Sequence, residues 1–150
     1  MNAYSAPAAS AAEAIDFRDA VPNLAVKLAG FTLGAAGFFV SGSGLQLLAF
    51  FELSWGMLAA ASMLLTLGSV SVLVAPFVIK GRSWASMLAV PTAAVMALTT
   101  MVWAVLSVSM LFFSPLVVVG ALTSAAAALV APFAVPGALR ATRARNALYA

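Results

Sequence analysis

Four carboxylates are the only acidic groups that this 150-residue chain offers for chemistry. Glu13, Asp16 and Asp19 fall within the first 23 residues, and Glu52 stands alone between two apolar segments. General acid–base catalysis needs two titratable groups within reach of one substrate. A proton or cation path through a membrane needs an ionisable group inside a span. The sequence has neither arrangement, so we predict no catalytic residue and no enzyme activity.

Cysteine and histidine are both absent from the sequence. Without cysteine there is no disulfide, no iron–sulfur cluster and no thiolate nucleophile. Without histidine there is no imidazole to bind haem, zinc or copper. Methionine is the remaining soft ligand, but methionine in apolar helices usually fills gaps in the packing. We therefore expect no cofactor and no metal site.

The most regular spacing in the sequence is a series of small residues in the first apolar segment. Gly30, Gly34, Gly37, Ser41 and Gly44 follow one another at steps of four, three, four and three, which places them on one helix face. Gly30 and Gly34 also form a GxxxG pair. Between helices in lipid, such residues let two backbones approach closely. We predict a helix-packing face, inside the protein by preference, or alternatively against another subunit.

Weaker faces of small residues are expected in the other apolar segments. They are Ala59, Ser62, Thr66 and Ser69 in the second segment; Ser86, Ala93, Thr100 and Ser107, flanked by Ala97 and Ala104, in the third; and Gly120, Ser124 and Ala128 in the fourth. The simplest interpretation is that all these faces meet inside one helix bundle.

One amide and one proline in the apolar segments are further candidates, the first for an interface and the second for a kink. Gln46 is the only amide deep in one of them, on the side opposite the glycine series, and with Glu52 it is a candidate polar group at an interface. Pro91 should free the carbonyl of Met87 and kink its helix.

The composition sets the fold class. Hydrophobic residues make up 65% of the chain and charged residues 7%, against about 25% charged in soluble domains. Four segments, at about 24–51, 55–79, 84–113 and 116–135, are long enough to cross a bilayer. They lack the alternation of polar and apolar residues typical of barrel strands. We predict an all-α integral membrane protein, a four-transmembrane-helix bundle with up-down-up-down topology.

The basic residues predict how the chain lies in the membrane. All seven fall beside the N-terminus, the 80–83 loop or the C-terminus, which share one side of the predicted bundle. The positive-inside rule then places both termini in the cytoplasm, and we expect a bacterial cytoplasmic (inner) membrane. The net charge of +3 is too dispersed to indicate nucleic-acid binding.

Two shorter segments flank the predicted transmembrane domain, residues 24–136. Residues 1–23 form a cytoplasmic N-terminal segment, in which the capping-box spacing of Ser10 and Glu13 favours a short amphipathic helix on the membrane surface. A frayed tail is the alternative. Residues 137–150 form a basic cytoplasmic tail, in which Arg140, Arg143 and Arg145 are expected to contact lipid headgroups.

A pentapeptide occurs twice in the sequence, at Leu73–Phe77 and Leu129–Phe133. Gly81 and Gly137 match at the same offset of 56 residues. The match suggests a duplicated helix hairpin, although chance similarity in a chain rich in alanine, valine and leucine accounts for it as well.

The sequence favours a non-catalytic small membrane protein, a structural or accessory subunit that packs through small-residue faces. Its expected partners are the lipid bilayer and other membrane subunits or copies of itself, with no nucleic acid. The alternative is a small oligomeric channel or transporter with a pathway at subunit interfaces, which the repeat, Pro91 and Glu52 favour. The lack of charge at mid-membrane depth counts against this alternative.

Overall fold

Four helices make up the secondary structure of the residues that the structure, a computed structural model, describes: 22–50, 54–109 and 115–148. They are α1 (Leu24–Phe50), α2 (Trp55–Ile79), α3 (Ser83–Ser109) and α4 (Pro115–Leu148). Each helix is long and apolar enough to cross a membrane. The all-α class and the four potential spans are therefore confirmed, and the chain is an integral membrane protein by this criterion.

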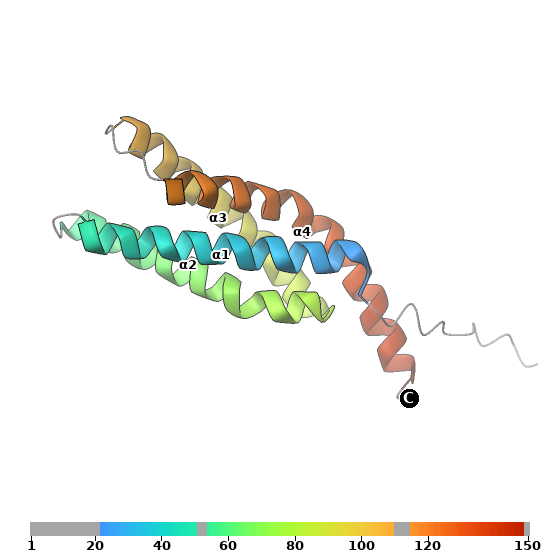
Figure 1. The fold of residues 1–150 in the computed structure, drawn as a ribbon. Helices are drawn as coiled ribbons and strands as arrows, with labels where there is room; N and C mark the ends of the chain where they lie inside the picture. Colours follow the sequence, from blue (N-terminus) through green and yellow to red (C-terminus); the bar gives the residue numbers. More distant parts are fainter. Residues whose placement is uncertain (1–21, 51–53, 110–114, 149–150) are drawn as a thin grey trace, which may run out of the picture.

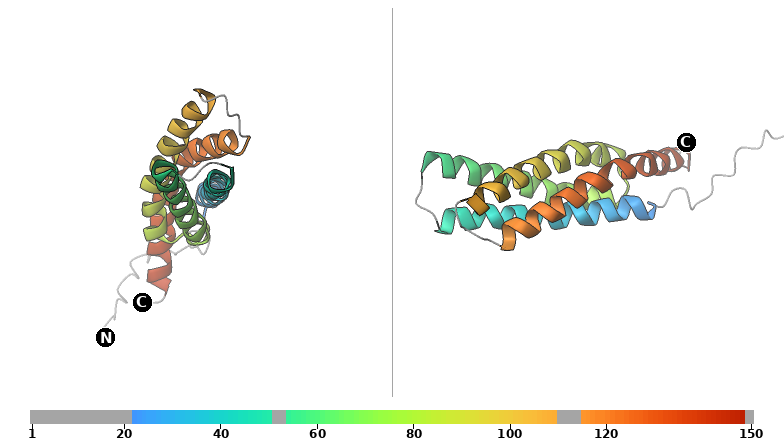
Figure 2. Two further views of the ribbon diagram at one scale, coloured as in Figure 1. Left: turned by 90° about the vertical axis from the view of Figure 1, so that its left-hand side faces the viewer. Right: turned by 90° about the horizontal axis from the view of Figure 1, so that it is seen from above.

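The helices run alternately up and down in one elongated bundle (Figures 1 and 2). Helix α1 packs extensively on α2 and α4, and α3 packs mainly on α4. The contact between α2 and α3 is smaller, because these two helices diverge from the turn that joins them. The start of α1, the α2–α3 turn and the end of α4 lie at the same end of the bundle (Figure 1).

Short local motifs fix the two ends of α2. Ser54 caps α2, because its hydroxyl accepts a hydrogen bond from the Met57 amide at 3.3 Å. Gly81, with a φ of 67°, ends α2 in a left-handed conformation. The amide of Gly81 donates to Val78 at 2.7 Å and that of Arg82 donates to Phe77 at 3.0 Å, which is the Schellman pattern of a helix terminus.

Helix α4 is longer than the sequence analysis predicted. The predicted fourth span ends at about Val135, and the helix that contains it continues through Pro136 and Gly137 to Leu148. Pro132 and Pro136 both lie on the exposed side, so the buried face keeps its contacts through this region. That face consists of Ala131, Ala134, Ala138 and Ala141.

The 34 residues of α4 span about 51 Å, more than the hydrocarbon core of about 30 Å. Its last turns project beyond the other helices (Figure 1). Most of the segment predicted as a basic tail is therefore helical. The predicted amphipathic helix in residues 1–23 and the predicted end of the third span at residue 113 lie outside the described residues.

Small side chains dominate the interior of the bundle. The fully buried set contains a few large residues, led by Leu33, Leu64 and Met96. Most of the other buried residues are alanine, valine and serine. Because lipid is as apolar as leucine, helix association in a membrane depends on close van der Waals contact, which small residues favour.

Candidate functional site

The glycine series of α1 lies against α2. An added methyl group on Gly37 would come within 2.7 Å of the Gly68 carbonyl oxygen and 2.8 Å of the Ser71 Cβ. On Gly44 it would come within 3.1 Å of the Ala61 carbonyl oxygen. These are backbone or near-backbone atoms that cannot move aside. The two helices therefore approach so closely that glycine is required on α1.

The remaining members of the series differ in how tightly they are held. An added methyl on Gly30 would collide with Ile79 and lie 3.1 Å from the Ala75 carbonyl oxygen. On Gly34 its nearest neighbour would be the Ala75 Cβ at 3.3 Å. Ser41 lies opposite Gly68 of α2. A methyl group added to Gly68 would collide with the Ser41 hydroxyl. The structure thus brings all five predicted residues to one internal interface between α1 and α2.

The third and fourth helices also pack through small residues. Helix α3 buries Ala85, Ala89 and Ala93, and α4 presents its alanine face to the interior. Of the predicted faces, Ser86, Ala93, Thr100, Gly120 and Ser124 are buried, whereas Ala97, Ala104 and Ala128 are half-buried. The Ser107 side chain lies outside the described part of the chain.

The predicted face of the second helix is wrong. Ala59, Ser62, Thr66 and Ser69 are all exposed on the outside of the bundle. Helix α2 instead buries a different side, which contains Leu64, Gly68, Ser71 and Val78. The physical reason is that every side of this helix is apolar, so the close approach to the α1 glycines sets its rotation. We call the four exposed residues the α2 outer stripe.

Of the other candidate residues, the structure describes Gln46 and Pro91, which lie on different helices. Gln46 is half-buried near the end of α1 and makes a polar or packing interaction. Glu52 lies outside the described residues. Pro91 lies on the exposed side of α3, which continues as a helix on both sides of it. The kink predicted there stays a prediction.

Hydroxyl groups in the spans mostly bond to their own helix. Ser62 donates to the Leu58 carbonyl at 2.6 Å, Thr66 to Ser62 at 2.7 Å and Thr99 to Val95 at 2.8 Å. Ser71 donates to Leu67 at 2.7 Å. A hydroxyl with its hydrogen committed in this way is a poor donor to a passing solute. Within the described ranges, no cluster of three or more potential metal-ligating residues occurs.

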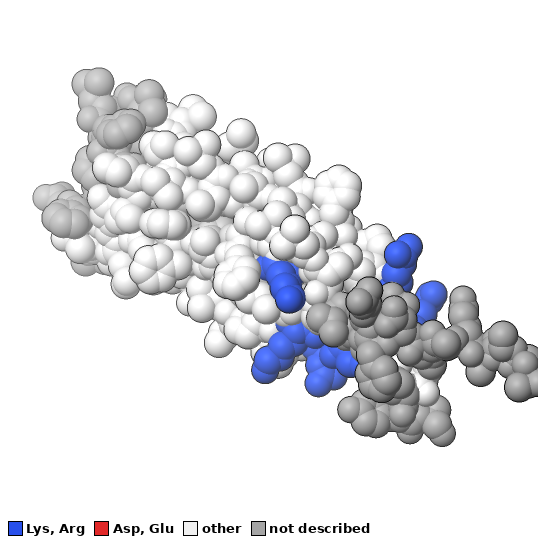
Figure 3. Space-filling model, turned by 45° about the vertical axis from the view of Figure 1, so that its right-hand side comes forward, with Lys and Arg blue, Asp and Glu red and all other residues white. Residues whose placement is uncertain are grey.

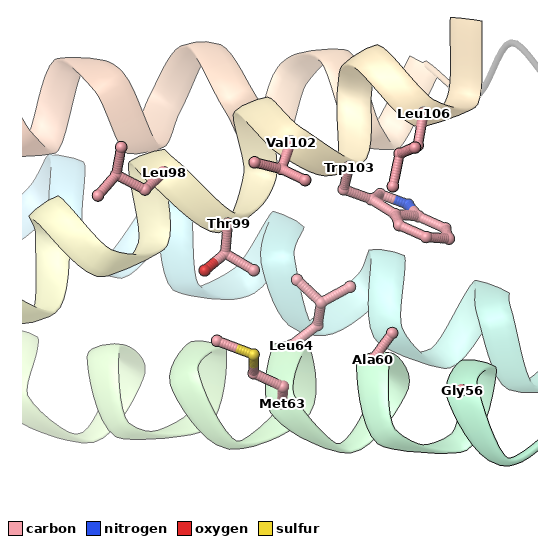
Figure 4. A pocket seen from close by; sticks show the side chains of 9 residues that line it. All are labelled: Gly56, Ala60, Met63, Leu64, Leu98, Thr99, Val102, Trp103 and Leu106. Atoms are coloured by element: carbon pink, nitrogen blue, oxygen red, sulfur yellow. The ribbon is translucent and has the colours of Figure 1, made fainter. Parts of the chain in front are cut away.

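An apolar groove of about 520 Å³ opens where α2 and α3 diverge. Leu64 of α2 points toward Thr99 and Val102 of α3 across the groove. Trp103 lies toward the end of the groove where Ala60 is found (Figure 4). Gly56 and Ala60 form the α2 wall near the start of that helix. An added methyl on Gly56 would meet nothing within 4 Å, so packing within the described chain does not account for this glycine.

Basic side chains gather at one end of the molecule (Figure 3). Arg140 and Arg143 are exposed there, as expected for headgroup contacts. Arg145 instead turns back to the α2–α3 turn. Its Nη2 donates to the carbonyls of Gly81 at 2.7 Å and Lys80 at 3.1 Å.

This contact satisfies carbonyls at the end of α2 that the helix itself leaves without a donor. The Arg145 Nε also donates to the Ala141 carbonyl at 3.1 Å, which holds the guanidinium in place. The sequence analysis missed this role, because it requires α4 to continue past Gly137 and so bring Arg145 beside Gly81.

Comparison with known proteins finds no family model, no curated protein and no solved structure that matches the chain.

Proposed function

We propose that this chain is a non-catalytic membrane subunit that packs through small-residue helix faces against other membrane subunits or copies of itself. The observation that carries the proposal is the α2 outer stripe beside the α2–α3 groove. Four small residues in a row lie exposed on a helix whose opposite side is already filled by α1. In lipid, a face of this kind favours close approach of another helix.

The surroundings of the stripe support a protein partner more than a solute. The groove beside it is lined almost entirely by apolar side chains. Hydroxyls on the stripe bond back to their own helix, as Ser62 and Thr66 do. Ion and substrate pathways depend on charged or available polar groups inside the membrane. The described spans offer packing surface rather than such groups, so we rank a channel or transporter second.

A bulky residue on the stripe tests this proposal. We expect Ala59→Leu to reduce the amount of partner, or of second copy, that is extracted with the chain several-fold, because the larger side chain holds another helix away. Ala94→Leu is the matched control, since Ala94 is also exposed but lies on α3. The measurement is the stoichiometry of complexes purified from the native membrane. Equal recovery of the partner, or of the second copy, with Ala59→Leu and with Ala94→Leu would refute a role for the α2 outer stripe.

The proposed orientation places both termini in the cytoplasm of a bacterial cell, with the chain in the inner membrane. It is supported by the basic residues at the start of α1, in the α2–α3 turn and in the last turns of α4, which lie at the same end of the bundle: Lys27, Lys80, Arg82, Arg140, Arg143 and Arg145. Basic residues near spans are retained on the cytoplasmic side. In this proposal residues 1–23 lie along the same membrane surface.

A reporter fused after Ala150 tests the orientation. A cytoplasmic reporter, such as a fluorescent protein that folds only in the cytoplasm, should be active, whereas alkaline phosphatase at the same position should be inactive. The reverse pattern would place both termini outside and overturn the proposed topology.

A further inference from the structure

A small hollow of about 130 Å³ opens at the basic end of the bundle. It lies between the start of α3 and the last turns of α4. Its lining combines two arginines with other polar residues and one tryptophan: Arg82, Ser83, Trp84, Thr142, Arg145 and Asn146. The hollow exists because α4 continues past the bundle and runs beside the α2–α3 turn.

The two arginines give the hollow a positive charge. Arg145 is held by hydrogen bonds from its Nε and Nη2, so its Nη1 group remains to serve another acceptor. Arg82 is exposed among the described residues and lines the same hollow. Lys80, directly after α2, and Arg143, in the last turns of α4, lie at the same end of the bundle and add to the positive potential. The chemistry of the lining therefore suits a phosphate group, which arginine binds with charge-assisted hydrogen bonds.

The position of the hollow indicates the source of that phosphate. Trp84 lines the hollow, is half exposed, and has its ring 5.3 Å from the ring of Phe77 at the end of α2. Tryptophan beside the end of a span is typical of the level of the lipid headgroups. Beyond this level α2 and α3 enter the apolar part of the bundle. At this depth in a membrane, phosphate groups belong to phospholipid headgroups.

We propose that this hollow binds the phosphate of an anionic phospholipid. Arg82 and Arg145 donate to the phosphate oxygens, the Ser83 hydroxyl and the Asn146 amide supply further donors, and the Trp84 ring contacts the glycerol and the first acyl carbons. The site would anchor α4 to the α2–α3 turn through the lipid. The inference does not depend on the identity of any protein partner.

The test compares two arginine variants of the full chain in detergent. Native mass spectrometry measures binding of dioleoyl phosphatidylglycerol and, for comparison, dioleoyl phosphatidylcholine. We expect the wild type to prefer phosphatidylglycerol. Arg82→Gln should weaken that binding about fivefold, the contribution of one basic residue near an anionic surface. Arg140→Gln, which removes the same charge outside the hollow, should change it less than twofold.

A third variant, which leaves the charge unchanged, and a second kind of probe, free phosphate, complete the test. Asn146→Ala removes an exposed donor of the hollow without altering charge, and should also weaken phosphatidylglycerol binding. Equal losses in Arg82→Gln and Arg140→Gln would overturn the site, because they indicate diffuse attraction to the whole basic end. Inorganic phosphate is the second probe. Arg82-dependent binding of inorganic phosphate with no preference for phosphatidylglycerol would overturn the assignment to a lipid.

Discussion

Alanine in place of Gly37 or Gly68 should lower the free energy of unfolding of the protein by about 1–3 kcal/mol, the usual cost of overpacking. The added methyl on Gly37 would lie 2.7 Å from the Gly68 carbonyl oxygen, and that on Gly68 would lie 2.6 Å from the Gly37 carbonyl oxygen. Both contacts involve backbone, so α1 and α2 would have to separate along their interface. The loss should appear as a lower midpoint in unfolding by sodium dodecyl sulfate in mixed micelles.

Gly42 provides a matched control on the same helix. An added methyl there meets nothing within 4 Å. Because alanine is the better helix former by up to about 1 kcal/mol, Gly42→Ala should be neutral or slightly stabilising. Gly34→Ala should fall between these extremes, since its nearest contact is a side chain at 3.3 Å. If Gly37→Ala and Gly42→Ala had the same midpoint, the close contact of α1 with α2 would be contradicted.

Replacement of Arg145 should have the second-largest effect. Arg145→Gln removes the charged donor from the carbonyls of Lys80 and Gly81. We expect the variant to lose about 1–2 kcal/mol of stabilising free energy at this turn. This is toward the lower end of the range for hydrogen bonds to a charged group, because this end of the bundle is open to water. The loss should be local. Hydrogen exchange of the Gly81 and Arg82 amides, which close the end of α2, should become faster.

Arg143→Gln is the control for Arg145→Gln. Arg143 is exposed and lies two residues before Arg145, so its replacement removes the same amount of charge from the same end of α4. In the Arg143→Gln variant, hydrogen exchange of the amides at the α2–α3 turn should be as fast as in the wild type. If both variants changed the exchange of Gly81 equally, the effect would be one of total charge, and the specific bond from Arg145 to the turn would be refuted.

The sequence was sufficient for the features that depend on local chemistry. Ser54 and Gly81 mark the two ends of α2 because a capping hydroxyl and a left-handed glycine have effects that are independent of the rest of the fold. The glycine face of α1 was also predictable, since five small residues at helical spacing in an apolar segment are typical of close helix packing. Four apolar stretches of sufficient length predicted four spans.

Features that depend on tertiary packing could not be predicted in the same way. The rotation of α2 was predicted wrongly because lipid and the bundle interior are both apolar, so hydrophobicity does not distinguish the inner side from the outer one. The continuation of α4 beyond the predicted span, through Pro136 and Gly137, was not predicted. The buried alanine face of this helix extends as far as Ala141 and accompanies the continuation. The contact of Arg145 with Gly81 follows from that length.

We propose that this chain functions as a non-catalytic subunit in a larger membrane assembly. The most direct test is gentle extraction of the tagged protein from its native membrane, followed by native mass spectrometry. We predict a discrete complex that contains the chain with other membrane subunits, or with a fixed number of its own copies, at constant stoichiometry. A single chain that carries only lipid, under conditions that preserve other membrane complexes, would contradict the claim.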